Sequence, residues 1–179
     1  MTRPDSAAGA PVPTTLEEFM AQALQMELHA VERYNEFAEM METHNNREVA
    51  EWFRKMAVIE GKHVTQIMAE MGWSQPPAPR AAALGSSGFE SAEAGEGDEL
   101  HYLMQPWHVL QLALANEQRA ERFYADLVQR TTVESVRKAA LELQQEEAEH
   151  VELVKAWLLK VPQPDPNWDH DPDPPRNDD

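Results

Sequence analysis

The stretch Glu147-Ala148-Glu149-His150 decides the fold, because the same Glu-x-x-His spacing occurs earlier in the chain as Glu60-Gly61-Lys62-His63. Residues three apart project from the same face of an α-helix, so both members of each pair can point inward together. Each pair stands in a segment where apolar residues recur every three to four positions, which is the period of an amphipathic helix. The sequence therefore predicts two helices that each carry a glutamate and a histidine on the buried face.

Two further amphipathic segments carry a single glutamate in the middle of an apolar stripe. Glu27 shares its stripe with Tyr34, and Glu117 shares its stripe with Tyr124, seven residues later in both cases. Start signals precede all four segments: a capping box at Thr15 and Glu18, Asn45 or Asn46, Pro106 in a first turn, and a capping box at Thr131 and Glu134. We expect helices over residues 15–43, 45–71, 106 to about 127, and 131–161.

The two halves of the chain repeat each other. A shift of 90 residues places the stripe of Glu27 on that of Glu117, and a shift of 87 places the stripe of Glu60 on that of Glu147. This pattern indicates a duplicated helical hairpin. Residues from about 72 to 105 are rich in Pro, Ala, Gly and Ser and are long enough to cross a bundle from end to end. The predicted fold is all-α, a ferritin-like antiparallel four-helix bundle with a long crossover between its second and third helices.

Length and composition predict one domain with polar tails. The chain has 179 residues, of which 42% are hydrophobic, enough to bury a core over residues 14–161. Residues 1–13 and the acidic, Pro- and Asp-rich residues 162–179 are expected to be disordered.

Cysteine is absent, which excludes disulfides, thiolate zinc sites and iron–sulfur clusters. The net charge of -17 argues against nucleic acid as a partner. With neither a secretory signal nor a membrane span in the sequence, we expect a cytoplasmic protein without a membrane partner.

The four glutamates on the apolar stripes predict a pair of bound metal ions. An unpaired carboxylate in such a place costs several kcal/mol to desolvate, and no Lys or Arg shares the stripes at that level. Four carboxylates balance two divalent cations, and two neutral imidazoles complete the set. One Glu from each of two helices, with Glu-x-x-His from the other two, is the ligand set of ferritin-like di-iron and di-manganese proteins. Oxygen and imidazole ligands suit iron, our first choice, or manganese. The predicted ligands are Glu27, Glu60, His63, Glu117, Glu147 and His150.

Other side chains receive less specific interpretations. The hydroxyls of Tyr34 and Tyr124 can reach across to a neighbouring helix and support the metal ligands, although as core aromatics both residues need no further role. Five methionines are expected to fill gaps in the core, and no haem is expected: Met26, Met40, Met41, Met56 and Met68. The remaining histidines are expected at the surface, with a proton relay as the alternative for His108: His29, His44, His101, His108 and His170.

At these residues the sequence resembles the rubrerythrin-like branch of the ferritin-like superfamily, where Glu with Tyr seven residues on, followed by Glu-x-x-His, occurs twice. The similarity covers about residues 15–161. It implies a non-haem di-iron centre that oxidises ferrous to ferric iron with hydrogen peroxide or oxygen, a reaction linked to oxidative stress. It further implies ligand roles by position: single-Glu ligands Glu27 and Glu117, bridging Glu60 and Glu147, and terminal His63 and His150.

Two departures from the family pattern affect what the resemblance implies. Rubrerythrins carry a Cys-rich rubredoxin domain that supplies electrons, whereas this chain has no cysteine, so its electron donor is expected to be external. They also have an extra Glu one turn after the third-helix ligand, where this chain has Ala120. We therefore expect a site of six ligands, in which Ala30 and Ala120 leave room for a small oxidant.

Three functions fit the sequence. The first is a di-iron oxidoreductase of the peroxidase or oxidase type, and the second is a ferroxidase that serves iron storage or transport. The third is a structural bundle whose ligands no longer bind metal. A homodimer is expected, because several tryptophans lie outside the predicted core stripes: Trp52, Trp73 and Trp107.

Overall fold

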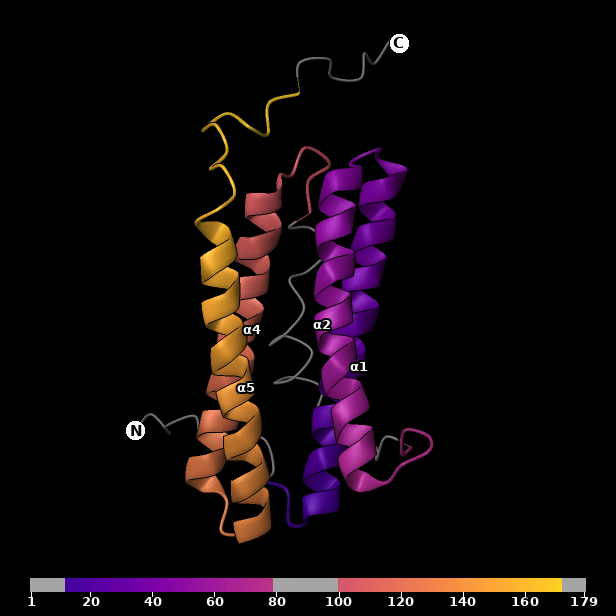
Figure 1. The fold of residues 1–179 in the computed structure, drawn as a ribbon, viewed down its shortest axis with the longest axis vertical. Coiled ribbons are helices and arrows are strands. Elements are labelled where there is room, and N and C mark those ends of the chain that lie inside the picture. The colour runs from indigo at the N-terminus through magenta and orange to yellow at the C-terminus, as the bar shows by residue number, and fades with distance from the viewer. Residues whose placement is uncertain (1–11, 79–99, 172–179) are drawn as a thin grey trace, which may run out of the picture.

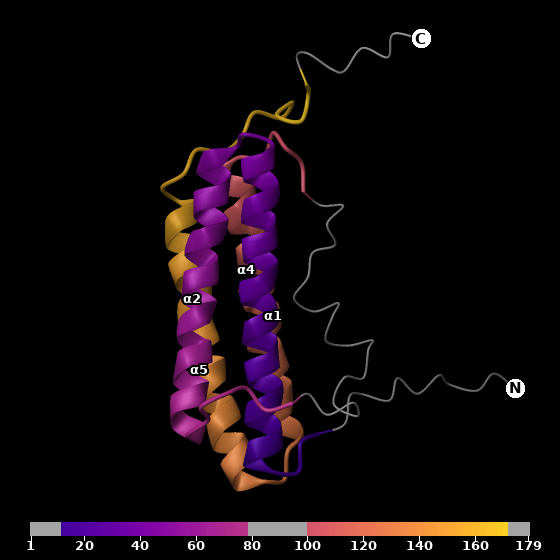
Figure 2. The ribbon, with the colours of Figure 1, turned by 90° about the vertical axis from the view of Figure 1, so that its right-hand side faces the viewer.

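The computed structural model describes residues 12–78 and 100–171, and all regular secondary structure within them is helical. The chain runs through α1 (Leu16–Thr43), α2 (Arg47–Met71), α4 (Pro106–Arg130) and α5 (Glu134–Leu158). Helices α1 and α2 form one antiparallel hairpin, and α4 and α5 form the other (Figure 1). Seen from the side, the first hairpin lies in front of the second (Figure 2). The predicted ferritin-like four-helix bundle is confirmed.

The connection between the hairpins joins helix ends that lie at opposite ends of the bundle (Figure 1). Helix α2 ends at the opposite end from the start of α4 (Figure 1), as the predicted crossover requires, although residues 79–99 of that segment lie outside the described residues. The N-terminal segment predicted to be disordered also lies outside them up to residue 11. Of the acidic tail the structure describes residues 162–171, in which Trp168 packs against the core. The disorder of both tails stays a prediction.

Side chains fix the start of each helix in the first hairpin. Thr15 accepts a hydrogen bond from the Glu18 N–H at 3.1 Å, which is the predicted cap. The Glu18 carboxylate bonds to the Thr14 N–H at 2.9 Å, so the reciprocal bond of the capping box reaches one residue further back. At the start of α2, the Asn46 side chain accepts from the Val49 N–H at 3.4 Å. Asn45 precedes it with a φ of 58°, a left-handed conformation that asparagine tolerates well.

The second hairpin confirms one predicted start and corrects the other. Helix α4 begins at Pro106, and the Nδ1 of His108 accepts from the Gln105 N–H at 3.0 Å. The capping box predicted at Thr131 and Glu134 is wrong, because α5 begins at Glu134 and no side chain caps it. Thr131 instead ends α4, with its N–H donating to the Leu127 carbonyl at 2.9 Å. Only residues 131–133 separate the two helices, so Thr131 ends α4 and does not cap α5.

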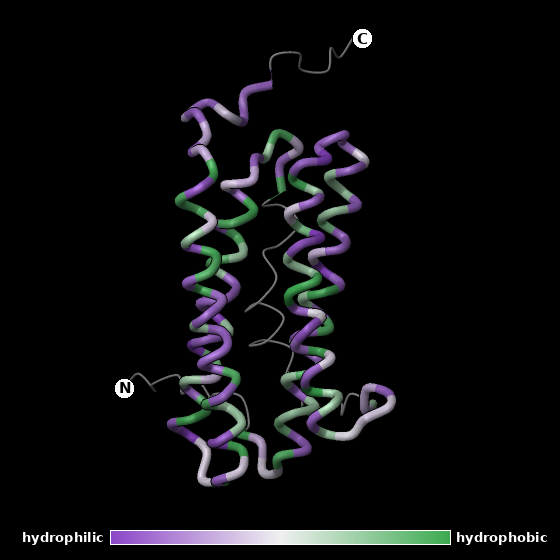
Figure 3. Tube along the Cα trace, viewed as in Figure 1, coloured by the Kyte–Doolittle hydropathy of each residue, from purple (hydrophilic) through white to green (hydrophobic). Residues whose placement is uncertain are grey.

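The core consists of two apolar clusters, one toward each end of the bundle. One is centred on residues such as Phe37, Phe53 and Leu110, and the other on residues such as Phe19, Leu24 and Tyr124. Hydrophobic and hydrophilic stretches alternate along all four helices (Figure 3), as amphipathic packing requires. The predicted stripes are buried, but Met40 is 40% exposed, so it does not fill the core as expected. No helix in the described ranges combines the length and the apolar character that a membrane span requires.

Candidate metal centre

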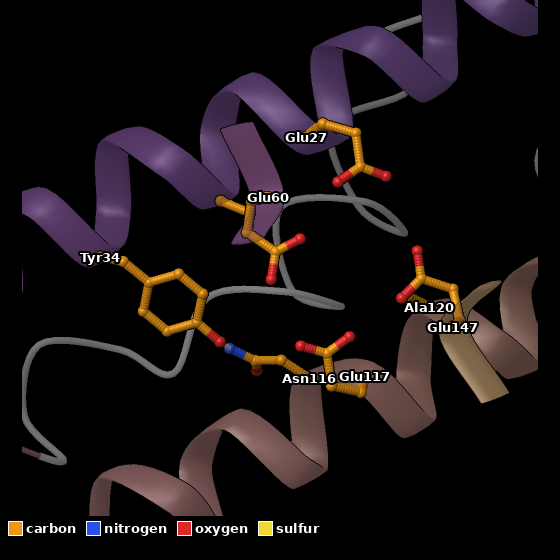
Figure 4. Close-up of a pocket in the computed structure, with 8 residues that line it drawn as sticks. Glu27, Tyr34, Glu60, Asn116, Glu117, Ala120 and Glu147 are labelled. Atoms are coloured by element: carbon orange, nitrogen blue, oxygen red, sulfur yellow. Dashed lines mark hydrogen bonds between the residues drawn. The ribbon is translucent and has the colours of Figure 1, made fainter. Parts of the chain in front are cut away.

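All four predicted glutamate ligands are buried in the middle of the bundle. Their exposed fractions lie between 2% and 5%, although carboxylates are almost never buried without a partner. The carboxylates of Glu27, Glu60, Glu117 and Glu147 point toward one another from the four helices (Figure 4). The helical period places each on the inward stripe of its own helix, and the packing of the hairpins brings the four carboxylates together.

The six predicted ligands form two groups. The candidate ligand atoms of Glu27, Glu60 and His63 lie within 4.8 Å of one another, and those of Glu117, Glu147 and His150 do the same. Among the described residues these are the groups that could hold a metal ion. Each hairpin supplies one group: α1 and α2 the first, α4 and α5 the second. The repeat in the sequence is thus a repeat of candidate metal-binding groups.

Both histidines direct Nδ1 toward the carboxylates. His63 Nδ1 lies 3.4 Å from Glu27 Oε2 and 3.6 Å from Glu147 Oε1, and His150 Nδ1 lies 3.3 Å from Glu117 Oε2. The two rings stack with their centroids 4.7 Å apart. Glu147 also approaches His150 Nδ1, at 3.9 Å. Its carboxylate thus lies near the nitrogens of both groups, as a bridging ligand would.

Several buried polar atoms of the site have no hydrogen-bond partner among the described residues. They are His63 Nδ1, His150 Nδ1 and Glu117 Oε1. Each such atom is costly in an apolar interior, so native structures rarely leave one without a partner. Imidazole nitrogen and carboxylate oxygen are suitable donors to divalent iron or manganese. The residues present therefore fit two such ions, whose charge would compensate the buried carboxylates.

The carboxylates perturb the titration of His63. Burial lowers its pKa, but the negative charges of Glu27, Glu146 and Glu117 outweigh burial, so the pKa lies above its ordinary value of 6.5. Without metal, a proton on this imidazole compensates part of the negative charge. A proton and a metal ion therefore compete for the same side chain.

A cavity of about 20 Å³ opens between the carboxylates, lined by Ala30 and Ala120 as well as by Tyr34 and Asn116. A volume of this size is sufficient for a small molecule about the size of water. Both alanines lie where we expected room for a small oxidant. Ala120 also occupies the position of the additional glutamate in the family pattern, so its methyl group leaves space there instead of a carboxylate.

The two tyrosines reach across between α1 and α4, as the sequence indicated. The Tyr124 hydroxyl donates to Glu27 Oε1 at 3.5 Å and lies 3.8 Å from Met26 Sδ. The Tyr34 hydroxyl accepts from Asn116 Nδ2 at 2.9 Å (Figure 4). Met26 and Asn116 are equivalent positions of the repeat, each directly before a single-Glu ligand. The surroundings of the two hydroxyls therefore differ although the tyrosines themselves repeat.

Sequence reasoning missed two side chains that contact the site. Asn116 bonds to Tyr34 and accepts in turn from the guanidinium of Arg119. Glu146 lies 3.7 Å from His63 Nε2. Nothing in the sequence distinguishes Glu146 from the surface glutamates around it, and the only signal for Asn116 is that it interrupts the repeat opposite Met26.

The remaining histidines lie away from the centre. His29, His44 and His170 are exposed, as predicted, whereas His101 and His108 are half-buried. The His108 ring caps α4 and lies 3.9 Å from the ring of Trp168. Its pKa is lowered, first by burial. A structural role explains His108 without a proton relay.

Comparison with known proteins agrees with this arrangement. Residues 18–158, which include all six predicted ligands, match the Rubrerythrin family model. The crystal structure of an uncharacterized conserved protein from Magnetospirillum magnetotacticum is similar, with a TM-score of 0.63 and 34% sequence identity over 84% of this chain and 98% of that one. No curated protein matches the sequence. Since the match spans all four helices and both Glu/His groups, the chain belongs to the rubrerythrin family.

Proposed function

We propose that this protein is a non-haem di-iron oxidoreductase that reacts with hydrogen peroxide or oxygen. The observation that supports it best is the pair of buried Glu/His groups, with Glu147 within 4 Å of both histidines. Two ions held by these neighbouring groups would both be available to one small molecule. Six protein ligands would also leave coordination positions open at two metals, as a catalytic rather than a structural site requires.

When bound, two ferrous ions supply one electron each, which with two protons reduces hydrogen peroxide to two molecules of water, or oxygen to hydrogen peroxide. The protein fixes the positions of the ions through the six ligands and limits access to a small cavity beside Ala30 and Ala120. The packed clusters above and below the site exclude bulk water. Repeated turnover would require an external electron donor. The proposed roles of Tyr34 and Tyr124 are to orient the site, since Tyr124 contacts Glu27.

Anaerobic reconstitution with ferrous iron tests the proposal. We expect two irons per chain, and faster growth of ferric absorption in the near ultraviolet with hydrogen peroxide than with oxygen. Glu60→Ala should lose both irons if Glu60 bridges them. Glu70→Ala is a matched control, because Glu70 lies on the exposed face of the same helix. Failure of the wild-type protein to bind iron in a fixed ratio would overturn the proposal.

The same titration tests the ferroxidase alternative. An oxidoreductase should stay at two irons per chain through repeated cycles of reduction and oxidation. A protein that serves iron storage should instead turn over rapidly with oxygen and take up many more irons. Uptake beyond two irons with retained ferric mineral would replace the peroxidase or oxidase assignment by iron handling.

A further inference from the structure

The two metal-binding groups differ in what supports their histidines. His63 directs Nδ1 toward the carboxylates of the site, and its other ring nitrogen, Nε2, lies 3.7 Å from Glu146 Oε2. Glu146 comes from α5, so it approaches His63 of α2 from the other hairpin. Its Oε2 atom is buried and has no hydrogen-bond partner among the described residues. This oxygen is therefore available to a donor on the imidazole.

Gln66 holds Glu146 in this position. The Gln66 side-chain amide donates to Glu146 Oε1 at 2.8 Å, one turn of α2 beyond His63. One carboxylate oxygen is thus fixed to α2, and the other remains directed at the imidazole. The His63–Glu146 distance of 3.7 Å is slightly longer than a hydrogen bond. A metal ion on Nδ1 of His63 would fix the tautomer that carries its hydrogen on Nε2. This N–H would then be the hydrogen-bond donor for Glu146 Oε2, which otherwise has none.

The second group has no equivalent of this support. In the repeat, Ile59 stands at the position of Glu146 and Leu153 at the position of Gln66. Among the described residues, the carboxylates that pair with His150 do so through Nδ1. The side chain of His150 is also more exposed than that of His63, at 18% against 6%. The duplicated hairpins thus present one histidine supported by a carboxylate and one without that support.

We propose that Glu146 is a positioning residue for His63 and makes the Glu27–Glu60–His63 group the tighter of two unequal metal sites. A carboxylate on the distal N–H of a metal-binding imidazole fixes the orientation of the ring and raises its basicity. Loss of such a partner typically lowers metal affinity about 10- to 100-fold. The inference rests on the proposed function, because it requires that the two groups bind metal.

Titration with Mn²⁺ under anaerobic conditions tests the proposal, because free Mn²⁺ is measured directly by electron paramagnetic resonance. The wild-type protein should show two binding events of unequal affinity. Glu146→Gln should weaken the tighter event about 10- to 100-fold and leave the weaker one nearly unchanged. Glu149→Gln is the matched control, since Glu149 lies on the exposed face of the same helix and its substitution should change neither event. Gln66→Leu should weaken the tighter event in the same direction by a smaller factor.

The outcomes separate this inference from the proposed function. Wild-type protein that binds no Mn²⁺ and no Fe²⁺ contradicts both. Two events in the wild type that Glu146→Gln leaves unchanged, or weakens equally, contradict the role of Glu146 alone. Circular dichroism and the thermal midpoint of the metal-free variants reveal any loss of fold. If Glu146→Gln fails to fold, Gln66→Leu provides the same comparison, because Gln66 is exposed.

Discussion

Hydroxyl groups that touch a ligand carboxylate contribute to a metal site by fixing that carboxylate. Tyr124→Phe removes the hydroxyl 3.5 Å from Glu27 Oε1 but keeps the ring that packs against Phe19 at 6.2 Å. We expect an unchanged fold and about fivefold weaker Mn²⁺ binding, equivalent to a hydrogen bond of about 1 kcal/mol. Tyr102→Phe is the control, because its hydroxyl bonds to Asp171 away from the centre. Equal Mn²⁺ affinity in wild type and Tyr124→Phe would exclude a role for this hydroxyl.

The raised pKa of His63 gives metal binding and stability opposite pH dependences. The folded, metal-free protein holds this proton more tightly than the unfolded chain, whose pKa is about 6.5. Protonation therefore stabilises the metal-free protein below that value, and this stability is lost as the pH rises through the raised pKa. Metal binding requires the neutral imidazole, so Mn²⁺ affinity should rise over the same range.

Urea denaturation of the metal-free protein and Mn²⁺ titration between pH 6 and 8.5 measure both trends. In His63→Asn, the contribution of this residue to both trends should disappear. A metal-free protein that gains stability with rising pH across this range would contradict the assigned direction of the pKa shift.

Among the helices, Asn46 links the start of α2 to a segment that is distant in the sequence. Asn46 caps α2, and its side-chain amide donates to the Tyr102 and Met104 carbonyls at 3.1 and 2.7 Å. These carbonyls belong to the turn before α4, so the first hairpin is tied to the start of the second. Asn46→Ala should lower the free energy of unfolding by about 1–2 kcal/mol, measured by urea denaturation. Asn45→Gly, at a φ of 58°, should change it by only a few tenths. Equal effects of the two substitutions would contradict this capping role.

Local sequence signals predicted the helices well. They did not predict which of two neighbouring helices each connecting residue caps. Thr15, Asn46 and Pro106 stand where the structure uses them. Thr131 has the same capping chemistry, yet it completes α4, because a threonine between two closely spaced helices can serve either end. Composition and period cannot decide between these ends, since the choice depends on tertiary contacts, such as the bond from Arg137 to the Thr131 carbonyl at 2.6 Å.

At the site, too, local sequence patterns cannot predict contacts that depend on how the helices pack. The six residues of the two candidate groups could be singled out because glutamate and histidine on an apolar stripe conflict with the pattern of an amphipathic helix. Glu146 breaks no such pattern, since it lies at the edge of the buried face among other glutamates. Its contact with His63 crosses from α5 to α2 and depends on how the hairpins pack. Side chains that support ligands from a neighbouring element thus become visible only in the structure.

In the whole molecule, the candidate metal centre lies where the apolar core is interrupted. The two clusters each include residues from all four helices, and the layer between them holds the buried carboxylates. Without metal, this layer opposes the association of the hairpins through repulsion between like charges. Ions bound to the two groups would reverse the sign of that contribution, and bridging by Glu60 and Glu147 would join α1 and α2 to α4 and α5.

Metal binding should therefore stabilise the entire bundle rather than one hairpin. We expect the thermal midpoint to rise with Mn²⁺ concentration, with a gain of about 2.7 kcal/mol per site at one hundred times the dissociation constant. Calorimetry should give a single unfolding transition, because metal ligands on all four helices would make the helices unfold together. Chelation should reverse the shift, and Glu60→Ala should abolish it while retaining the helical fold. A thermal midpoint that Mn²⁺ and Fe²⁺ leave unchanged would favour a structural bundle with vestigial ligands, since an ion bound to the native state must stabilise it.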